Sequence, residues 1–340
     1  MPRRHSGMPS QPLCSKATVH LTTPPLSHQF SHHVAHGQSG KSAEWVIRSL
    51  FPYLDALIWQ DFVIANTVVI DGKVSDLSEV VETGQRLDFS IENYQEDEVD
   101  SNWKLLWEGQ EIIAVHKPPT LPVSRTTRNV YNNLVQLVRR QSPWGDAHLL
   151  HRLDLDTSGI VLMAKTGEFA SKWQPQLRQL MEQKVYHAIV HGSPNWQTRE
   201  LLCDLNTRSD SLIRCQMHIC LPGEKGKFSH TRFKVLKRSE NFSLIKCQLI
   251  TGRKHQIRAH LAHLDHPIVG DKIYSNNGDY YLKRLQDAVT EADKTQLGSD
   301  HHLLLAQQVT LRLDAQQTVT ISTPHRSKSW QTLWQQQFKS

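Results

Sequence analysis

Short apolar runs separated by polar turns occupy most of the chain beyond residue 103 and predict mainly strands. Seven runs have the alternating or β-branched composition of strands, namely residues 112–115, 160–164, 184–191, 228–236, 242–250, 303–313 and 319–321. Two segments have apolar residues at helical spacing, namely 167–183 and 254–264. Since a polar turn at 239–241 separates two of the strands, we expect these two to pair as antiparallel neighbours.

The pattern before residue 103 is different. Residues 1–40 contain five prolines and no acidic residue. Their apolar residues follow neither the helical nor the strand spacing, which predicts a mobile tail. Residues 41–92 predict a small α+β module, with a helix through Val46, Leu50 and Leu54 and a strand that stops at the turn 71–72. Residues 93–102 carry four acidic side chains and predict a polar linker.

The net charge of +6 is unevenly distributed along the chain. Residues 1–48 carry a net +4, residues 49–100 a net −10 and residues 101–340 a net +12. Affinity for phosphates comes mostly from lysine and arginine side chains. A polyanionic partner is therefore expected to bind the large C-terminal portion.

Composition disfavours several classes of protein. No apolar run approaches the roughly 18 residues of a membrane span, so we expect no membrane partner. The five cysteines form an odd, scattered set without a CxxC pair, which is typical of a cytoplasmic protein and disfavours a disulfide scaffold. The glycine patterns that bind nucleotide cofactors are absent from the sequence.

Residues 151–159, HRLDLDTSG, form the segment that is richest in candidate catalytic side chains. A polar loop that leads into a buried strand often carries catalytic groups. Asp154 lies near Arg152, and a carboxylate beside a fixed cation stays ionised, ready to act as nucleophile or general base. The alternative is a hydrogen-bonded turn, and composition alone favours that alternative for Asp154 and more strongly for Asp156.

A second segment, residues 251–260, predicts the start of a basic helix. His255 and Arg258 lie three residues apart on one face, where the arginine can reach a buried carboxylate from another element. A solvated basic face is the alternative. The nearby His260, His263 and His266 lack a carboxylate or cysteine that would complete a ligand set, so no metal is expected.

Together these segments resemble the RluA-like family of RNA pseudouridine synthases. Residues 151–159 are similar to the family's HRLD-x-x-TSG motif, and residues 184–188, KVYHA, to its second motif. Residues 252–260, GRKHQIRAH, with HPIVGD at 266–271, are similar to its third motif. HKP at 116–118 resembles the element that precedes the first motif, and the resemblance covers residues 105–325 approximately.

The resemblance implies an α+β fold. Residues 103–330 would form the catalytic domain, a mixed, largely antiparallel β-sheet with flanking helices and a central cleft. The implied reaction is the isomerisation of specific uridines to pseudouridine in ribosomal large-subunit RNA or transfer RNA. The enzyme would be a monomer and would need no cofactor.

The resemblance also implies roles for single residues. Asp154 would be the catalytic nucleophile, attacking carbon 6 of the uracil or the anomeric carbon of the sugar. Arg258 would pair with this carboxylate, and Tyr186 would stack on the extracted base. Arg152 would help to displace the flipped nucleotide. The further expected RNA contacts are His151, Arg253, Lys254 and His255.

The N-terminal module departs from the family pattern. Many relatives carry a basic RNA-binding module that resembles a ribosomal small-subunit protein, and residues 41–92 have a similar outline. Here, however, acidic and aromatic residues stand where cations are expected, namely Asp55, Trp59, Asp61 and Phe62. We expect a degenerate module that binds phosphates weakly.

Two alternative functions are compatible with the residues. A non-catalytic RNA-binding accessory protein would use the same basic surface, but simple binding requires neither Asp154 nor Tyr186. Hydrolysis of a glycosidic bond would need a second carboxylate, for which Asp156 is the candidate.

Overall fold

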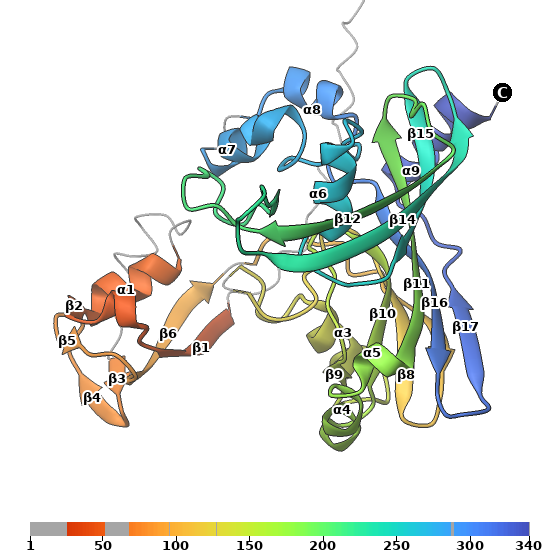
Figure 1. Cartoon of the computed structure of the whole chain (residues 1–340). Helices are drawn as coiled ribbons and strands as arrows, with labels where there is room; N and C mark the ends of the chain where they lie inside the picture. The colour runs from red at the N-terminus through yellow and green to blue at the C-terminus, as the bar shows by residue number, and fades with distance from the viewer. Residues whose placement is uncertain (1–25, 52–67, 95, 127, 287–288, 340) are drawn as a thin grey trace, which may run out of the picture. The chain divides into compact units, whose positions relative to one another are not determined.

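The computed structural model describes residues 26–51, 68–94, 96–126, 128–286 and 289–339, and the chain divides into two compact units (Figure 1). The N-terminal unit ends at Gln95, and the C-terminal unit begins at Glu96. Both units combine helices with strands. Within the described ranges, every helix is too short or too polar to cross a lipid bilayer.

The N-terminal unit is built on a sheet in which the described strands have the order β1-β6-β3-β4. These strands are β1 (Leu26–His33), β3 (Val68–Ile70), β4 (Lys73–Ser75) and β6 (Arg86–Tyr94). A second pair is formed by β2 (Lys41–Ser42) and β5 (Val80–Val81), and a 3-10 helix, η1 (His36–Gln38), follows β1. Helix α1 (Ala43–Leu50) begins after Ser42, whose hydroxyl accepts a hydrogen bond from the backbone N–H of Trp45.

Strand β1 corrects the expectation of a mobile tail over residues 1–40. It pairs antiparallel with β6, and Phe30 is buried between two other aromatic rings. The Phe30 ring stacks on Phe89 at 5.5 Å and meets the edge of Phe51 at 4.9 Å. The strand is hard to predict because serine and histidine neighbours hide its single aromatic anchor. Residues 1–25 lie outside the described residues.

Two other predictions for this unit have different outcomes. The hairpin turn between β3 and β4 is confirmed, and Asp71 and Gly72 both have the positive φ that a tight two-residue turn requires. The predicted helix through Leu54 instead ends at Leu50, with Phe51 as its C-cap. Leu54, like the four residues at 55, 59, 61 and 62 that depart from the family pattern, lies outside the described residues.

The expected linker at 93–102 is divided between the two units. Strand β6 continues to Tyr94, inside the N-terminal unit. Glu96 belongs to the C-terminal unit, where its carboxylate accepts hydrogen bonds from the backbone N–H groups of Val130, Tyr131 and Asn132 at 2.6 to 2.7 Å. Glu96, which the sequence assigns to a linker, therefore fixes the loop at 130–132 of the larger unit.

The C-terminal unit is built on one large sheet, which counts eleven strands over the described residues. Nine of them have the order β13-β12-β14-β15-β11-β16-β10-β8-β7, while β17 pairs with β16 and β9 with β10. The strands are β7 (Lys104–Glu108), β8 (Ile112–Lys117), β9 (His148–Leu149), β10 (Ser158–Ala164), β11 (Met181–His191), β12 (Thr198–Asn206), β13 (His218–Ile219), β14 (Lys227–Arg238), β15 (Phe242–Leu249), β16 (Leu304–Arg312) and β17 (Thr318–Ser322). The predicted pairing of β14 with β15 is confirmed.

Helices flank both faces of this sheet. They are α3 (Leu134–Gln141), α4 (Gly167–Trp173), α5 (Leu177–Leu180), α6 (Gln256–His263), α7 (Asp279–Leu285), α8 (Glu291–Leu297) and α9 (Lys328–Phe338), with a short 3-10 helix, η2 (Asn276–Gly278), before α7. The helix predicted over 167–183 is wrong as one element, because it breaks at Pro175 and its last residues join β11. The helix predicted over 254–264 is confirmed as α6, with shorter bounds.

Strand β16 lies between β10, which follows the loop that carries Asp154, and β11, which carries Tyr186 (Figure 1). Strands β10 and β16 form a parallel pair in a sheet whose other neighbours are antiparallel. Gly159 lies opposite Ala306 with a φ of 114°, and a Cβ at this position would clash with the Ala306 backbone. Gly159 is therefore required for β10, which follows the loop at 151–157, to approach β16.

Candidate active site

A cleft of about 1060 Å³ opens on the C-terminal unit. The lining segments are the loop at 151–157, the break between α4 and β11, strand β11 and the turn that leads into α6. Asp154, Tyr186 and Arg258 all line this cleft, although they are far apart in the sequence. Among the described residues that line it, Asp154 is the sole carboxylate.

Arg258 bridges two carboxylates at the base of the cleft. One guanidinium nitrogen, Nη1, donates to Oδ2 of Asp154 at 2.9 Å, which confirms the predicted ion pair. Nε and Nη2 donate to the two oxygens of Asp271 at 2.7 and 2.9 Å. This two-pronged contact fixes the plane of the guanidinium, so the remaining nitrogen is aimed at Asp154. We refer to Asp154, Arg258 and Asp271 as the cleft floor.

The cleft floor keeps Asp154 ionised. Burial on its own raises the pKa of the Asp154 carboxyl, but the charge of the Arg258 guanidinium and its hydrogen bond outweigh burial, so this pKa lies below its usual range. Burial opposes the charge of Asp271 in the same way, and Arg258 again holds the carboxyl pKa far below its usual range. The two acids in turn raise the pKa of Arg258 despite its burial.

His255 has an unusual backbone conformation directly before α6. Its φ of 53° is in the left-handed region, which is uncommon for a residue with a side chain. The ring is 92% buried in consequence of this turn, with Nε2 3.8 Å from Oδ2 of Asp154 and Nδ1 3.2 Å from the Tyr274 hydroxyl. Burial, together with Arg258, lowers the pKa of His255 to about 4, so the ring is neutral near pH 7. His255, expected as an RNA contact, therefore lies against the catalytic candidate.

The side chain of His151 is fixed by a hydrogen bond to the backbone of a neighbouring strand. Its Nε2 accepts a hydrogen bond from the backbone N–H of Leu162 in β10 at 3.1 Å. Burial lowers the pKa of this histidine to about 4. The ring therefore belongs to the cleft lining as a neutral group that fixes the start of the loop, and its contact with RNA stays a prediction.

Tyr186 faces the cleft from β11, which is confirmed as a strand. Ala188 and Val190 follow and are buried in the core, but the intervening Ile189 is buried as well, so both faces of this part of the strand are covered. Burial and the charge of Asp154 raise the pKa of the Tyr186 phenol, so the ring is uncharged near pH 7. A neutral aromatic ring beside a carboxylate can stack on a planar base.

Exposed cations and one exposed aromatic ring surround the opening of the cleft. Arg152, Arg253 and Lys254 are exposed and line it, as expected for RNA contacts. Phe228 is 50% exposed, and its carbonyl accepts a hydrogen bond from Nε of Arg253 at 2.8 Å. We refer to Arg152, Phe228, Arg253 and Lys254 as the cleft rim.

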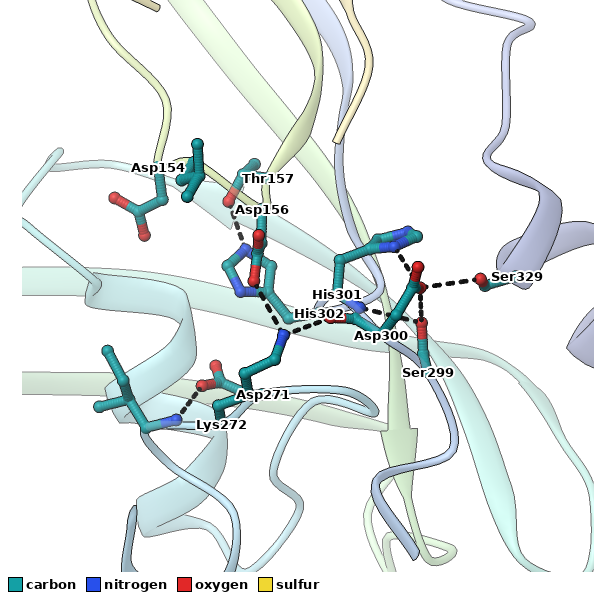
Figure 2. Close-up of polar contacts among 12 residues, drawn as sticks. Asp154, Asp156, Thr157, Asp271, Lys272, Ser299, Asp300, His301, His302 and Ser329 are labelled. Carbon is teal, nitrogen blue, oxygen red and sulfur yellow. Dashed lines mark hydrogen bonds and ion pairs between the residues drawn. The ribbon is translucent and has the colours of Figure 1, made fainter. Parts of the chain in front are cut away.

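Asp156 is not part of the cleft lining. Figure 2 shows its carboxylate turned toward Lys272, whose Nζ lies 3.3 Å away, while the carboxylate of Asp154 points elsewhere. Attraction to Lys272, opposed by burial, keeps the pKa of Asp156 below its usual range. The turn that composition favours for this residue is present, because the Thr157 N–H donates to the Asp154 carbonyl at 3.2 Å.

Several supporting residues have no role in the sequence analysis. Asp271 orients Arg258, and Tyr274 lies beside both Arg258 and His255. Lys117 is completely buried and donates to the backbone carbonyls of Pro118, Leu121 and Leu155, and burial lowers its pKa to about 7. Lys117 and Asp271 lie in runs that resemble family motifs. The sequence therefore draws attention to their positions, but it does not show which groups they contact.

The described residues contain no group of three or more His, Cys, Asp or Glu side chains placed to hold a metal ion. Of the three histidines considered for such a site, His260 contacts Ser229 and Cys203, and His266 contacts the carbonyl of His191. These contacts are those of structural histidines.

Comparisons with known proteins agree with this geometry. Residues 111–263 match the family model of the RNA pseudouridylate synthases. The chain is 34% identical over 197 residues to the dual-specificity RNA pseudouridine synthase RluA of Vibrio cholerae, covering 57% of this chain and 73% of that protein. It is 30% identical over 203 residues to the human pseudouridylate synthase RPUSD2, covering 60% of this chain and 36% of the relative.

A further relative is the mitochondrial tRNA pseudouridine(32) synthase of Saccharomyces cerevisiae, which is 30% identical over 211 residues, or 62% of this chain and 45% of the relative. The chain therefore matches less than half the length of the human and yeast relatives. The solved structure of human RNA Pseudouridylate Synthase Domain Containing 1 aligns with a TM-score of 0.53 at 21% identity, over 68% of this chain and 86% of that one. The predicted α+β fold with its mixed, largely antiparallel sheet is confirmed.

Proposed function

Because the chain belongs to the RluA-like family of RNA pseudouridine synthases, we propose that it isomerises specific uridines in RNA to pseudouridine, with Asp154 as the nucleophile. The observation that carries this proposal is an ionised carboxylate, paired with Arg258, in a cleft large enough for a nucleotide. A carboxylate in this state can attack carbon 6 of the uracil or the anomeric carbon of the sugar.

The reaction needs no group that the chain lacks. The bond between N1 of the uracil and the sugar breaks, the base turns, and a bond from carbon 5 to the sugar replaces it. The proton on carbon 5 leaves and N1 gains one, so neither an electron donor nor a transferred group is required. Asp154 supplies the nucleophile and leaves again when the product forms.

The surrounding residues support the steps around the chemistry. Tyr186 would stack on the uracil once it leaves the helix, and Arg152 at the rim would occupy the space that the base vacates. Extraction of a stacked base costs a few kcal/mol, so uridines in loops and bulges of RNA are the cheaper targets. Transfer RNA and ribosomal large-subunit RNA are the proposed substrates, and the relatives include a tRNA pseudouridine synthase and a dual-specificity RNA pseudouridine synthase.

Replacing the nucleophile tests the proposal. Asp154→Asn should lower pseudouridine formation at least about 10³-fold, because an amide cannot form the covalent bond. Affinity for RNA should stay within about tenfold of wild type, since phosphate contacts dominate it. The measurement is pseudouridine formation in RNA from cells that lack the gene, with Asp314→Asn, an exposed residue in the β16–β17 turn, as the matched control.

Other outcomes would identify another function. Release of free uracil by the wild-type protein would indicate glycosidic hydrolysis. RNA binding by the wild-type protein without any change of the base would indicate an accessory binding protein. Turnover by Asp154→Asn near the wild-type rate would remove Asp154 as the nucleophile.

A further inference from the structure

The loop that carries Asp154 is held at every one of four consecutive residues. Each residue bonds to a different segment of the C-terminal unit: Asp154 to Arg258 of α6, Leu155 to Lys117 at the end of β8, Asp156 to Lys272, and Thr157 to His302 before β16. Figure 2 shows the last two of these contacts together. A loop fixed in this way has little freedom to move its carboxylate.

Lys272 occupies a special position among these anchors, because it directly follows Asp271. The Asp271 carboxylate fixes Arg258, which contacts Asp154, while the Lys272 ammonium contacts Asp156. The Lys272 Nζ also donates to the backbone carbonyl of Asp300, in the segment that leads to β16. Two adjacent residues therefore hold the loop at two points, Asp271 through Arg258 at position 154 and Lys272 directly at position 156.

The pairing of Asp156 with Lys272 is largely shielded from water. The Lys272 side chain is 16% exposed and the Asp156 side chain 17%. Removing the ammonium would leave a nearly buried carboxylate without its ion-pair partner, which is costly. The carboxylate would then turn toward water, and because it lies two residues from Asp154, the loop would carry Asp154 away from Arg258.

We propose that Lys272 is a positioning residue, which locks Asp156 and thereby holds Asp154 in line with Arg258 and the cleft. The inference rests on the proposed function, because the quantity it controls is the rate of pseudouridine formation. Lys272 does not line the cleft, so its effect on catalysis passes through Asp156 and the loop. It should therefore affect the chemical step and leave RNA binding nearly unchanged.

The test compares Lys272→Met with wild type in steady-state pseudouridine formation. Lys272→Met should lower kcat about tenfold with KM within about threefold, and Lys272→Arg should keep kcat within about threefold, since it restores a cation of similar reach. Lys165→Met is the matched control. Lys165 is 18% exposed and pairs with Glu108 at 2.6 Å, beyond the far end of β10 from the loop.

A second variant separates positioning from general stability. In Asp156→Asn with Lys272→Met, the buried charge disappears along with its partner, so kcat should recover at least about threefold over Lys272→Met alone. The double variant also keeps the inference testable when the single variant fails to fold. Wild-type kcat in Lys272→Met, an equal loss in Lys165→Met, or no recovery in the folded double variant would overturn the positioning role. An inactive wild-type protein would instead refute the proposed function.

Discussion

The cleft floor and the cleft rim contrast in how their charges are partnered. In the floor, the Arg258 side chain is 6% exposed and Asp271 is fully buried. All three guanidinium nitrogens of Arg258 donate hydrogen bonds to carboxylates. In the rim, Arg152, Arg253 and Lys254 reach into solvent. We propose from this difference that the floor sets the charge and orientation of one carboxylate, while the rim provides affinity for RNA.

The largest effect should come from breaking the floor. Arg258→Met leaves two carboxylates without their cation, so kcat should fall about 10³-fold and the unfolding free energy should drop by about 3 kcal/mol. Burial then raises the pKa of Asp154 unopposed, so the acid limb of kcat/KM should move to higher pH. The measurements are steady-state rates across the acid range and thermal unfolding.

Arg232→Met is the control for the floor variant. Arg232 pairs with Glu200 at 2.8 Å through an exposed side chain on the same sheet, away from the cleft lining. It should change neither the rate nor its pH dependence. A wild-type rate and an unmoved acid limb in Arg258→Met would show that the floor does not maintain the charge of Asp154.

An intermediate effect is expected from the rim. Replacing Arg253 and Lys254 together by alanine should weaken RNA binding about tenfold and make the slope of log affinity against log salt shallower by about 1.4, as expected for two phosphate contacts. kcat should stay within about twofold, because neither side chain belongs to the floor. The measurement is RNA binding over a salt series, with Arg232→Ala plus Lys234→Ala, two exposed cations on β14, as the control. A loss of kcat at saturating RNA would contradict the division between floor and rim.

The smallest effect should follow removal of the N-terminal unit. Residues 1–95 carry seven basic and nine acidic side chains, so they add no cationic excess to the rim. A protein that begins at Glu96 keeps the carboxylate that fixes the loop before α3, and it should bind RNA within about threefold of the full chain. A tenfold, salt-dependent loss of affinity would show that the N-terminal unit contributes a phosphate-binding surface of its own.

Much of the C-terminal unit could be predicted from the sequence. Its buried strands are dense in β-branched residues, and the pairing of Asp154 with Arg258 followed from a motif at each position. Strand β12 was missed because residues 193–227 show no regular period. The break before α5 was missed because the apolar spacing continues past Pro175, although the proline cannot continue a helix.

The contacts that support Asp154 and Arg258 could not be predicted from the sequence, for a physical reason. Asp271 acts through the two hydrogen bonds that its carboxylate accepts from Arg258. The orientation of His255 depends on a left-handed backbone conformation that a histidine rarely adopts. Both arise from tertiary contacts between elements, which no local pattern encodes. Asp156 illustrates the same limit, since its contact with Lys272 and its position outside the cleft lining distinguish it from a second catalytic carboxylate.

The cleft floor holds two carboxylates for one guanidinium, and this imbalance has a consequence for the orientation of an incoming nucleotide. A region with surplus negative charge repels phosphodiester groups but does not repel an uncharged uracil. The cations at the mouth attract those same phosphates. In the proposed reaction, the electrostatic field of the cleft would therefore separate the parts of a nucleotide, admitting the base and keeping the strand outside.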